Sequence, residues 1–182
     1  MTESRIIQQP VIERITELNG ADLEDLCEAS NQAILDGNGF GWLTPPERSV
    51  QEAFWNGVVT IPVREVYAAR LEGGIVGSGQ LVKPFSNNEA GAHIAQISTF
   101  FIAPYARGHG LGIGLLSVIE QSAARQGFRI LEVDVRETQS AAISLIENNG
   151  FEKWAVKNDY AWNGQKFVDG FYYKKNLQEN LS

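Results

Sequence analysis

The sequence has a single cysteine, Cys27, and no run of 18 consecutive apolar residues. One thiol excludes an internal disulfide, and this fits a reducing, cytoplasmic compartment. The first ten residues, MTESRIIQQP, lack the long apolar core of a secretory signal. A helix that spans a membrane needs about 20 apolar residues. We therefore expect a cytoplasmic protein with neither a signal peptide nor a membrane span.

Basic residues are also scarce: 15 Lys and Arg against 22 Asp and Glu give a formal net charge of −7. Nucleic-acid-binding proteins need a basic face, so this balance argues against such a partner. It weakly favours a cationic substrate, because net charge acts on steering and solubility. The length of 182 residues and the apolar fraction of 43% are those of one globular domain, and no repeat or long polar linker divides the chain. We expect residues 1–182 to form a single domain.

Hydrophobic periodicity predicts strands and helices along the whole chain. A strand is expected over 11–18, followed by a helix over 20–39 with Asp22 as its N-cap and Gly37 as its stop. A proline- and aromatic-rich loop and a short helix follow over 40–59. The remaining expected elements are two strands around Gly73-Gly74, a strand over 92–103 ended by Pro104, a helix over 110–127, a strand over 128–137, a helix over 138–150, and a hairpin that turns at Asn163-Gly164.

The order of these elements predicts the fold class. A strand, a helix and a strand within 92–137 require a parallel crossover, whereas the hairpins on either side are antiparallel. In the strand over 128–137, Glu132 and Asp134 point to one face while the apolar residues between and beside them point to the other. We therefore expect an α/β protein, a mixed sheet with helices on its faces.

The stretch APYARGHGLGIG, residues 103–114, places four glycines between a strand and a helix. A flexible linker is one interpretation, although linkers do not usually lie within a crossover. A Walker phosphate loop is excluded, because no Gly-Lys-Ser/Thr follows. The dinucleotide fingerprint fits better, since Gly110 and Gly112 supply G-x-G and Asp134 lies about twenty residues on; however, its third glycine falls on Leu115. A nicotinamide or flavin oxidoreductase would also need more βαβ units than the chain supplies.

A third interpretation of this stretch is an anion site. Glycines free the backbone N–H groups over 108–113 from side-chain obstruction, and these groups lie at the start of the next helix, where the helix dipole favours negative charge. Arg107 directly precedes them and can hold a phosphate through two hydrogen bonds. This pattern predicts a ligand that carries a pyrophosphate.

The segment RGHGLG, residues 107–112, resembles the R/Q-x-x-G-x-G/A motif of the GCN5-related N-acetyltransferase (GNAT) superfamily. That motif binds the pyrophosphate of acetyl-CoA between a fourth strand and a third helix. A second stretch, LEVDVRETQSAAISLIENNGF over 131–151, is similar to the family's fifth strand and fourth helix. The resemblance covers most of the chain. It implies the GNAT fold, a mixed and largely antiparallel sheet of about seven strands flanked by about four helices, with acetyl-CoA as co-substrate and no metal.

The resemblance also implies which residues meet acetyl-CoA. In this family the strand before the motif is splayed from the next one, so its free backbone groups hold the pantetheine and a backbone N–H meets the oxyanion. Gln139 stands where the family has an asparagine early in its fourth helix. The implied cofactor-binding residues are Phe101, Ile102, Arg107, Gly108, His109, Gly110, Leu111, Gly112, Ile113 and Gln139.

The catalytic positions depart from the family pattern. The usual acid, a tyrosine four residues before a Gly-Phe pair, is Ile146 here, and the usual glutamate of the fourth strand is Gln96. Asp134 falls where the ribosomal-protein alanine acetyltransferases of this family carry a base glutamate; the alternative is a solvated or helix-capping carboxylate. His93 is a second candidate, as base or relay, unless it is a surface histidine at a strand end. Asp134 and His93 are the candidate catalytic residues.

Aromatic residues gather over 37–55, the segment with which this family walls its acceptor pocket. Phe40, Trp42 and Trp55 are the candidate substrate-binding residues, and packing of the loop to the body is the alternative for each. Four aromatic residues of the final hairpin are expected to pack, unless one of them replaces the missing acid: Tyr160, Trp162, Tyr172 and Tyr173.

Together these observations predict an acyl-CoA-dependent N-acyltransferase. It would move an acetyl group from acetyl-CoA to a primary amine, in a small molecule or at a peptide N-terminus, by direct attack in a ternary complex. The alternative, suggested by Ile146 and Gln96, is a catalytically silent module that binds or senses acyl-CoA. We expect a monomer or homodimer with no metal, nucleic-acid or membrane partner. The sequence indicates the donor and leaves the acceptor open.

Overall fold

The structure is a computed structural model, and it describes residues 10–37 and 40–178. Within these residues seven strands and four α-helices follow in the predicted order. They are β1 (Val11–Ile15), α1 (Gly20–Leu35), α2 (Arg48–Thr60), β2 (Arg64–Leu71), β3 (Gly74–Val82), β4 (Ile94–Ile102), α3 (Leu111–Arg125), β5 (Ile130–Arg136), α4 (Ser140–Asn148), β6 (Glu152–Trp162) and β7 (Phe167–Asn176), with a 3₁₀ turn at Pro104–Ala106.

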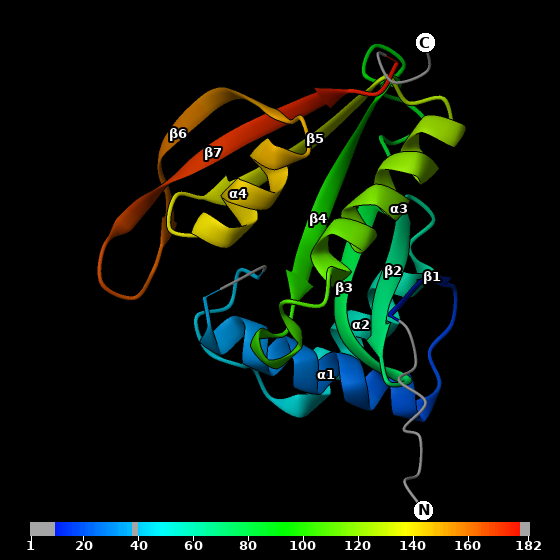
Figure 1. The fold of residues 1–182 in the computed structure, drawn as a ribbon, viewed down its shortest axis with the longest axis vertical. Helices are drawn as coiled ribbons and strands as arrows, with labels where there is room; N and C mark the ends of the chain where they lie inside the picture. Colours follow the sequence, from blue (N-terminus) through cyan, green and yellow to red (C-terminus); the bar gives the residue numbers. More distant parts are fainter. Residues whose placement is uncertain (1–9, 38–39, 179–182) are drawn as a thin grey trace, which may run out of the picture.

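The strands form one mixed sheet in the order β1-β2-β3-β4-β5-β7-β6 (Figure 1). Within the described residues β4 and β5 are the one parallel pair, and the strand pairs on either side are antiparallel. A parallel pair needs a crossover, which α3 supplies. The expected fold class, a mixed and largely antiparallel sheet flanked by helices, is confirmed.

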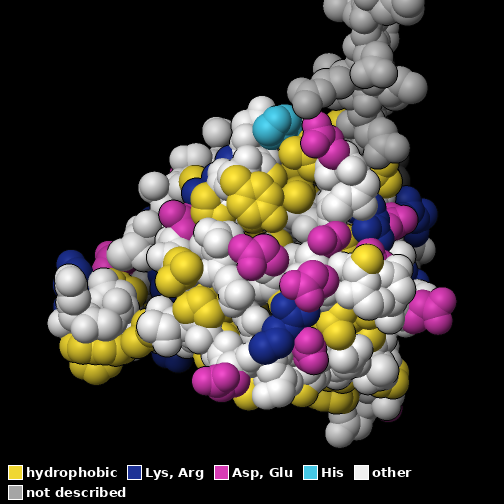
Figure 2. All heavy atoms as spheres, turned by 90° about the horizontal axis from the view of Figure 1, so that it is seen from below, with side chains coloured by type: hydrophobic (Ala, Val, Ile, Leu, Met, Phe, Trp, Pro, Cys, Tyr) yellow, Lys and Arg dark blue, Asp and Glu magenta, His cyan; other side chains and the backbone are white. Residues whose placement is uncertain are grey.

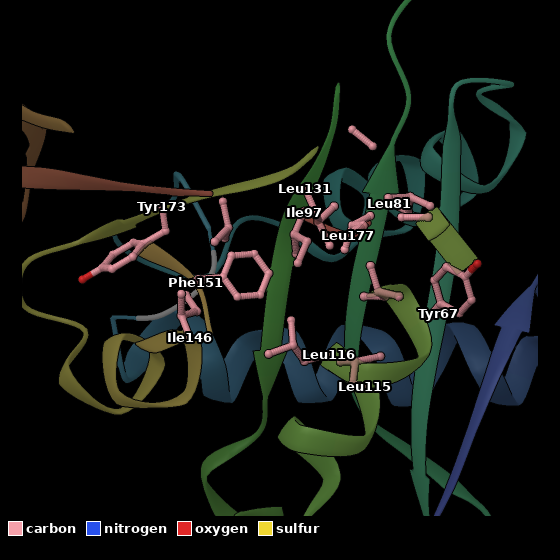
Figure 3. Packing of buried hydrophobic residues seen from close by; sticks show 14 of the residues in the cluster. Tyr67, Leu81, Ile97, Leu115, Leu116, Leu131, Ile146, Phe151, Tyr173 and Leu177 are labelled. Atoms are coloured by element: carbon pink, nitrogen blue, oxygen red, sulfur yellow. The ribbon is translucent and has the colours of Figure 1, made fainter. Parts of the chain in front are cut away.

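The two faces of the sheet are covered by different helix pairs. Alternate residues of β2 enter different clusters: Val66 and Ala68 pack with α1 and α2, whereas Tyr67 packs with α3. Figure 3 shows the α3 side, where Leu116 approaches Ile97 of β4. None of the helices in the described part of the chain is long and apolar enough to cross a membrane.

Several predicted boundaries of helices and strands shift by a few residues, among them those of α1, β1 and β4. The N-cap of α1 is Asn19 rather than Asp22, because the Asn19 Oδ1 accepts a hydrogen bond from the Asp22 N–H at 2.9 Å. Asp22 instead lies in the first turn, 2.8 Å from an Arg70 guanidinium nitrogen. β1 stops at Ile15 rather than at 18, because Leu18 turns to pack on the α1–α2 cluster. β4 begins at Ile94 rather than at 92. Gly37, at φ +76°, ends α1 as predicted.

The sheet opens between β4 and β5. The two strands pair from Ile94 with Ile130 to Gln96 with Glu132 and then part, β4 continuing beside β3 and β5 beside β7. Figure 1 shows their carboxyl ends pointing in different directions. A bulge in β4, with one extra residue relative to β3, lies at the parting point, and there Thr99 has φ +49°. The β4 backbone beyond Gln96 therefore has no β5 partner.

Candidate active site

A cavity of about 920 Å³ lies where β4 and β5 part. Its walls come from the bulged part of β4, the carboxyl end of β5, the inner side of α4, the end of β6 and the loop that follows α1. Among the residues that line the cavity are Phe40, Trp42, Phe54, Gln96, Ser98, Thr99, Asp134, Arg136, Gln139, Ile146, Tyr160 and Trp162.

The start of α3 forms a backbone anion site. Gly108 and Gly110 have φ of +83° and +74°, a conformation that glycine adopts without strain. A Cβ added at either would meet no atom within 4 Å, so the requirement there is conformational and the space above the loop is open. The first hydrogen bond of α3 runs from the Gly114 N–H to the Gly110 carbonyl at 3.0 Å. The N–H groups of 111–113 precede it and are available to an anion.

Arg107 directly precedes this anion site and has an acidic neighbour. Its guanidinium lies 2.6 Å from an Asp36 carboxylate oxygen at the end of α1, and both side chains are about half exposed. Figure 2 shows acidic side chains spread over the lower surface of the molecule. An anion that Arg107 binds must therefore compete with Asp36. His109 braces the same loop, with its Nδ1 3.1 Å from the Ala106 carbonyl.

The other residues expected to meet acetyl-CoA lie in two different settings. Gln139, the residue before α4, lines the cavity; its Oε1 accepts from the Arg136 N–H at 3.2 Å and its Nε2 donates to the Gly37 carbonyl at 3.3 Å. Phe101 is buried, with its ring 5.1 Å from that of Phe40, and lies behind the cavity wall. Ile102 packs into the core on the α3 side. Only the backbone of these last two β4 residues is placed for ligand contact.

Asp134 and Tyr160 meet inside the cavity. Asp134 projects from β5, and the Tyr160 hydroxyl of β6 donates a hydrogen bond to its Oδ2. A bulge in β6 makes this possible: between the pairs Lys157–Gly170 and Ala161–Val168, β6 has two residues more than β7. The bulged backbone includes Asp159 at φ +54°.

Gly170 of β7 makes room for the tyrosine. A Cβ added at Gly170 would run into the ring of Tyr160, so a larger residue there would displace the ring. Tyr172 supports the ring from the side, with centroids 6.1 Å apart and planes nearly perpendicular at 88°. Burial, and then the hydrogen bond to Asp134, raise the pKa of the Tyr160 hydroxyl well above its usual range. The hydroxyl therefore stays protonated at neutral pH.

Tyr160 is one of four hairpin aromatics that the sequence alone does not separate. The signal that could have found it is Gly170, because an isolated glycine within a strand marks a bulge or a close approach of another group. Of the other three, Trp162 also lines the cavity, whereas the buried Tyr173 donates to Glu147 at 2.8 Å outside it.

The remaining candidate acid–base residues are separated. Ile146 and Gln96 both line the cavity, so an apolar side chain and an amide occupy the positions that the family pattern gives to acid and base. His93 lies in the turn before β4, is exposed, and is not among the residues that line the cavity. Its carbonyl accepts from the Arg129 N–H at 2.9 Å, which anchors the start of β5. Within the described residues, no cluster of three or more His, Cys, Asp or Glu side chains is arranged to hold a metal ion.

The aromatic segment after α1 is split between wall and core. Phe40, Trp42 and Phe54 line the cavity, with the Phe40 and Trp42 rings stacked at 5.8 Å. Trp55 is fully buried and its Nε1 donates to the Ser30 Oγ at 3.1 Å, so it supports this wall from behind rather than facing a substrate. An Arg136 guanidinium that donates to the Phe40 carbonyl fastens the wall to β5.

Comparisons with known proteins identify the family to which this fold belongs. Residues 24–151 match the acetyltransferase (GNAT) family. The chain belongs to this family, as the glycine motif predicts. It is 51% identical, over 70% of its own length and 76% of the relative's, to an uncharacterized N-acetyltransferase of the hisH-hisA intergenic region of Azospirillum brasilense.

Solved structures share the fold at low sequence identity. An N-acetyltransferase from Staphylococcus aureus Mu50 is 18% identical, with a TM-score of 0.79 over 93% of this chain and 99% of that one. YncA from Salmonella typhimurium, a structure with its cofactor acetyl-CoA, is also 18% identical, with a TM-score of 0.76 over 96% and 98% of the two chains. These likenesses concern the fold.

Proposed function

We propose that the chain transfers an acetyl group from acetyl-CoA to a primary amine, by direct attack while both substrates are bound. The observation that supports this proposal best is the position of two parts of the site relative to β4. The anion site at the start of α3 and the cavity that holds Asp134 both adjoin the stretch of β4 that has left β5. Membership of the GNAT family and a structural neighbour that holds acetyl-CoA support the donor.

The donor half of the site fits a pyrophosphate followed by a long amide-bearing arm. The N–H groups of 111–113 and the guanidinium of Arg107 would hold the two phosphates. The unpaired β4 backbone from Ser98 to Phe101 offers donors and acceptors for the pantetheine amides, in the manner of an added strand. Acetyl-CoA then supplies the activated acyl group at the inner end of that arm.

The acceptor half of the site fits an amine. The Asp134 carboxylate attracts an ammonium group. The aromatic rings of Phe40, Trp42 and Phe54 can pack against the apolar part of an amine substrate or hold its ammonium group by a cation–π contact. A carboxylate beside the reacting nitrogen can also accept the proton that the nitrogen must lose.

The free-energy cost of deprotonating the acceptor depends on the pKa of its amine. An α-amine has a pKa of roughly 7.7–8.0, so neutralising it at pH 7 costs about 1 kcal/mol, whereas a lysine amine with a pKa of about 10.4 costs roughly 4–5 kcal/mol. Holding two reactants in line can supply roughly 7–11 kcal/mol. Proton removal by Asp134 therefore matters more for a lysine than for an amine of low pKa.

The direct test is release of free CoA from acetyl-CoA with a panel of amines: polyamines, amino acids, aminoglycosides and peptides with a free N-terminus. We expect thiol release that depends on the acceptor and saturates with both substrates. Tight binding of acetyl-CoA with no acceptor-dependent thiol release across the panel would instead support the silent acyl-CoA sensor.

Arg107→Ala tests the donor half. Losing a charge-assisted contact to phosphate removes roughly 1.5–3 kcal/mol, so we expect a 10- to 100-fold rise in the dissociation constant of acetyl-CoA, measured by calorimetry, and a smaller change in turnover at saturation. Arg125→Ala makes the same charge change at the far end of α3 and should leave the affinity unaltered. An unchanged affinity in Arg107→Ala would overturn the phosphate assignment.

Asp134→Asn tests the acceptor half. The amide keeps an oxygen for the Tyr160 hydroxyl but cannot take a proton, so we expect turnover near pH 7 to fall by roughly 10²- to 10⁴-fold. The free-amine fraction of the acceptor rises with pH, so the deficit should narrow as pH passes the amine's own pKa. The matched control is Glu132→Gln, two residues away on the same face of β5 and outside the cavity. Wild-type turnover at every pH would remove Asp134 from the chemistry.

A further inference from the structure

The bulge in β6 between Lys157 and Ala161 positions the side chain of Tyr160. β6 is an edge strand, paired only with β7 in the described sheet, and two of its residues leave the ladder between Lys157 and Ala161. One of the bulged residues, Asp159, adopts φ +54°, a conformation that costs free energy for a residue other than glycine. In return the bulge turns Tyr160 over Gly170 and brings its hydroxyl to Asp134. Bulges that redirect a side chain in this way are over-represented beside active sites.

We propose that Tyr160 is a catalytic residue that relays a proton from Asp134 to the departing CoA thiolate. The inference rests on the proposed acetyl transfer. It assigns to β6 the acid that the cavity lacks on α4, where Ile146 has no proton to donate. The relay consists of two side chains already joined by a hydrogen bond, with both of them on the cavity wall.

Each proton that moves during the acetyl transfer has a donor and an acceptor. An ammonium acceptor first gives one proton to Asp134, which releases it to solvent. The neutral nitrogen then forms a bond to the acyl carbon, and the carbon–sulfur bond breaks with its electron pair on sulfur. The nitrogen gives its second proton to Asp134 while Tyr160 gives its hydroxyl proton to sulfur and recovers one from the Asp134 carboxyl. The products are the amide, the thiol and one proton in solution.

Reference pKa values favour a relay over a tyrosine that acts alone. A phenol has a pKa of about 10 and a thiol one of about 8.5, so direct transfer from phenol to thiolate is uphill. A protonated carboxyl is a stronger acid than a thiol, so the overall transfer from a carboxyl through the hydroxyl to sulfur is downhill. Because burial and the carboxylate keep the Tyr160 hydroxyl protonated, it transmits a proton without storing negative charge.

The charged and titratable neighbours of Tyr160 come from three strands. Asp134 and Arg136 approach it from β5, and Tyr172 packs on it from β7. On β6 itself the Lys157 ammonium lies 5.8 Å from the ring centroid. Arg136 opposes the rise in the pKa of the hydroxyl, but burial and Asp134 have the larger effects, so the Tyr160 hydroxyl stays protonated and remains the donor over the neutral range.

Tyr160→Phe is the test, with the best acceptor from the amine panel. Deleting the oxygen keeps the ring over Gly170, so we expect kcat to fall by roughly 10²-fold or more with the dissociation constant of acetyl-CoA and the KM of the amine within about twofold of wild type. Tyr173→Phe deletes another hydroxyl of the same sheet that donates to a carboxylate, that of Glu147 on α4, outside the cavity, and it should leave kcat unchanged.

A double variant separates the relay from a packing role. If Tyr160 and Asp134 act as one unit, adding Tyr160→Phe to the Asp134→Asn variant should lower kcat further by less than about threefold. Wild-type kcat in Tyr160→Phe, or losses in the two variants that multiply, would overturn the relay. Either result would leave acceptor-dependent thiol release by the wild type intact, so failure of the relay is distinguishable from failure of the proposed acetyl transfer.

Discussion

The site depends on the early parting of β4 and β5. The strands share three residue pairs and then separate, although a crossover through α3 could have held them together along their length. Parting leaves a stretch of β4 backbone without a neighbour on its β5 side, in the middle of a sheet, where unpaired polar groups are costly unless something else satisfies them. The bulge at Thr99 fixes the place at which this happens, and the cavity, the helix start and the Asp134–Tyr160 pair all adjoin it.

The end of α1 and the loop that follows it contact both halves of the proposed site. The loop that follows α1 supplies the aromatic wall, and it is held from the other side of the cavity by the side chains of Arg136 and Gln139, which donate to its carbonyls. The same segment holds Arg107 through Asp36. A phosphate that recruits Arg107 must compete with this ion pair, which is exposed and therefore worth little. Donor binding and the position of the acceptor wall thus share one segment of chain.

Much of the fold follows from local sequence signals. Strand and helix periodicity, the glycine after α1 and the proline after β4 each act within a few residues, so the element order and the parallel crossover were predictable. The α3 start was predictable for the same reason, because glycines at positive φ and a preceding arginine are a local pattern. The N-cap of α1 was missed because Asn19 and Asp22 are both good capping residues, and only the backbone geometry chooses between them.

The site was harder to predict where it depends on register. Asp134 was predicted from its position in the family pattern. Its partner Tyr160 is selected by a bulge that shifts β6 against β7, and pairing irregularities of this kind depend on tertiary contacts. Trp55 was expected in the wall because the family resemblance places its segment there, whereas helix phase turns Trp55 into the core and leaves Phe54 at the cavity. Residue type indicated the chemistry, and the backbone decided which residues take part.

The most direct test of this account is a crystal structure with acetyl-CoA bound. We predict phosphate oxygens within hydrogen-bonding distance of the N–H groups of 111–113, the pantetheine alongside Ser98 to Phe101, and the thioester in the cavity beside Tyr160 and Asp134. A thioester outside the gap between β4 and β5, or a pyrophosphate away from the start of α3, would contradict it.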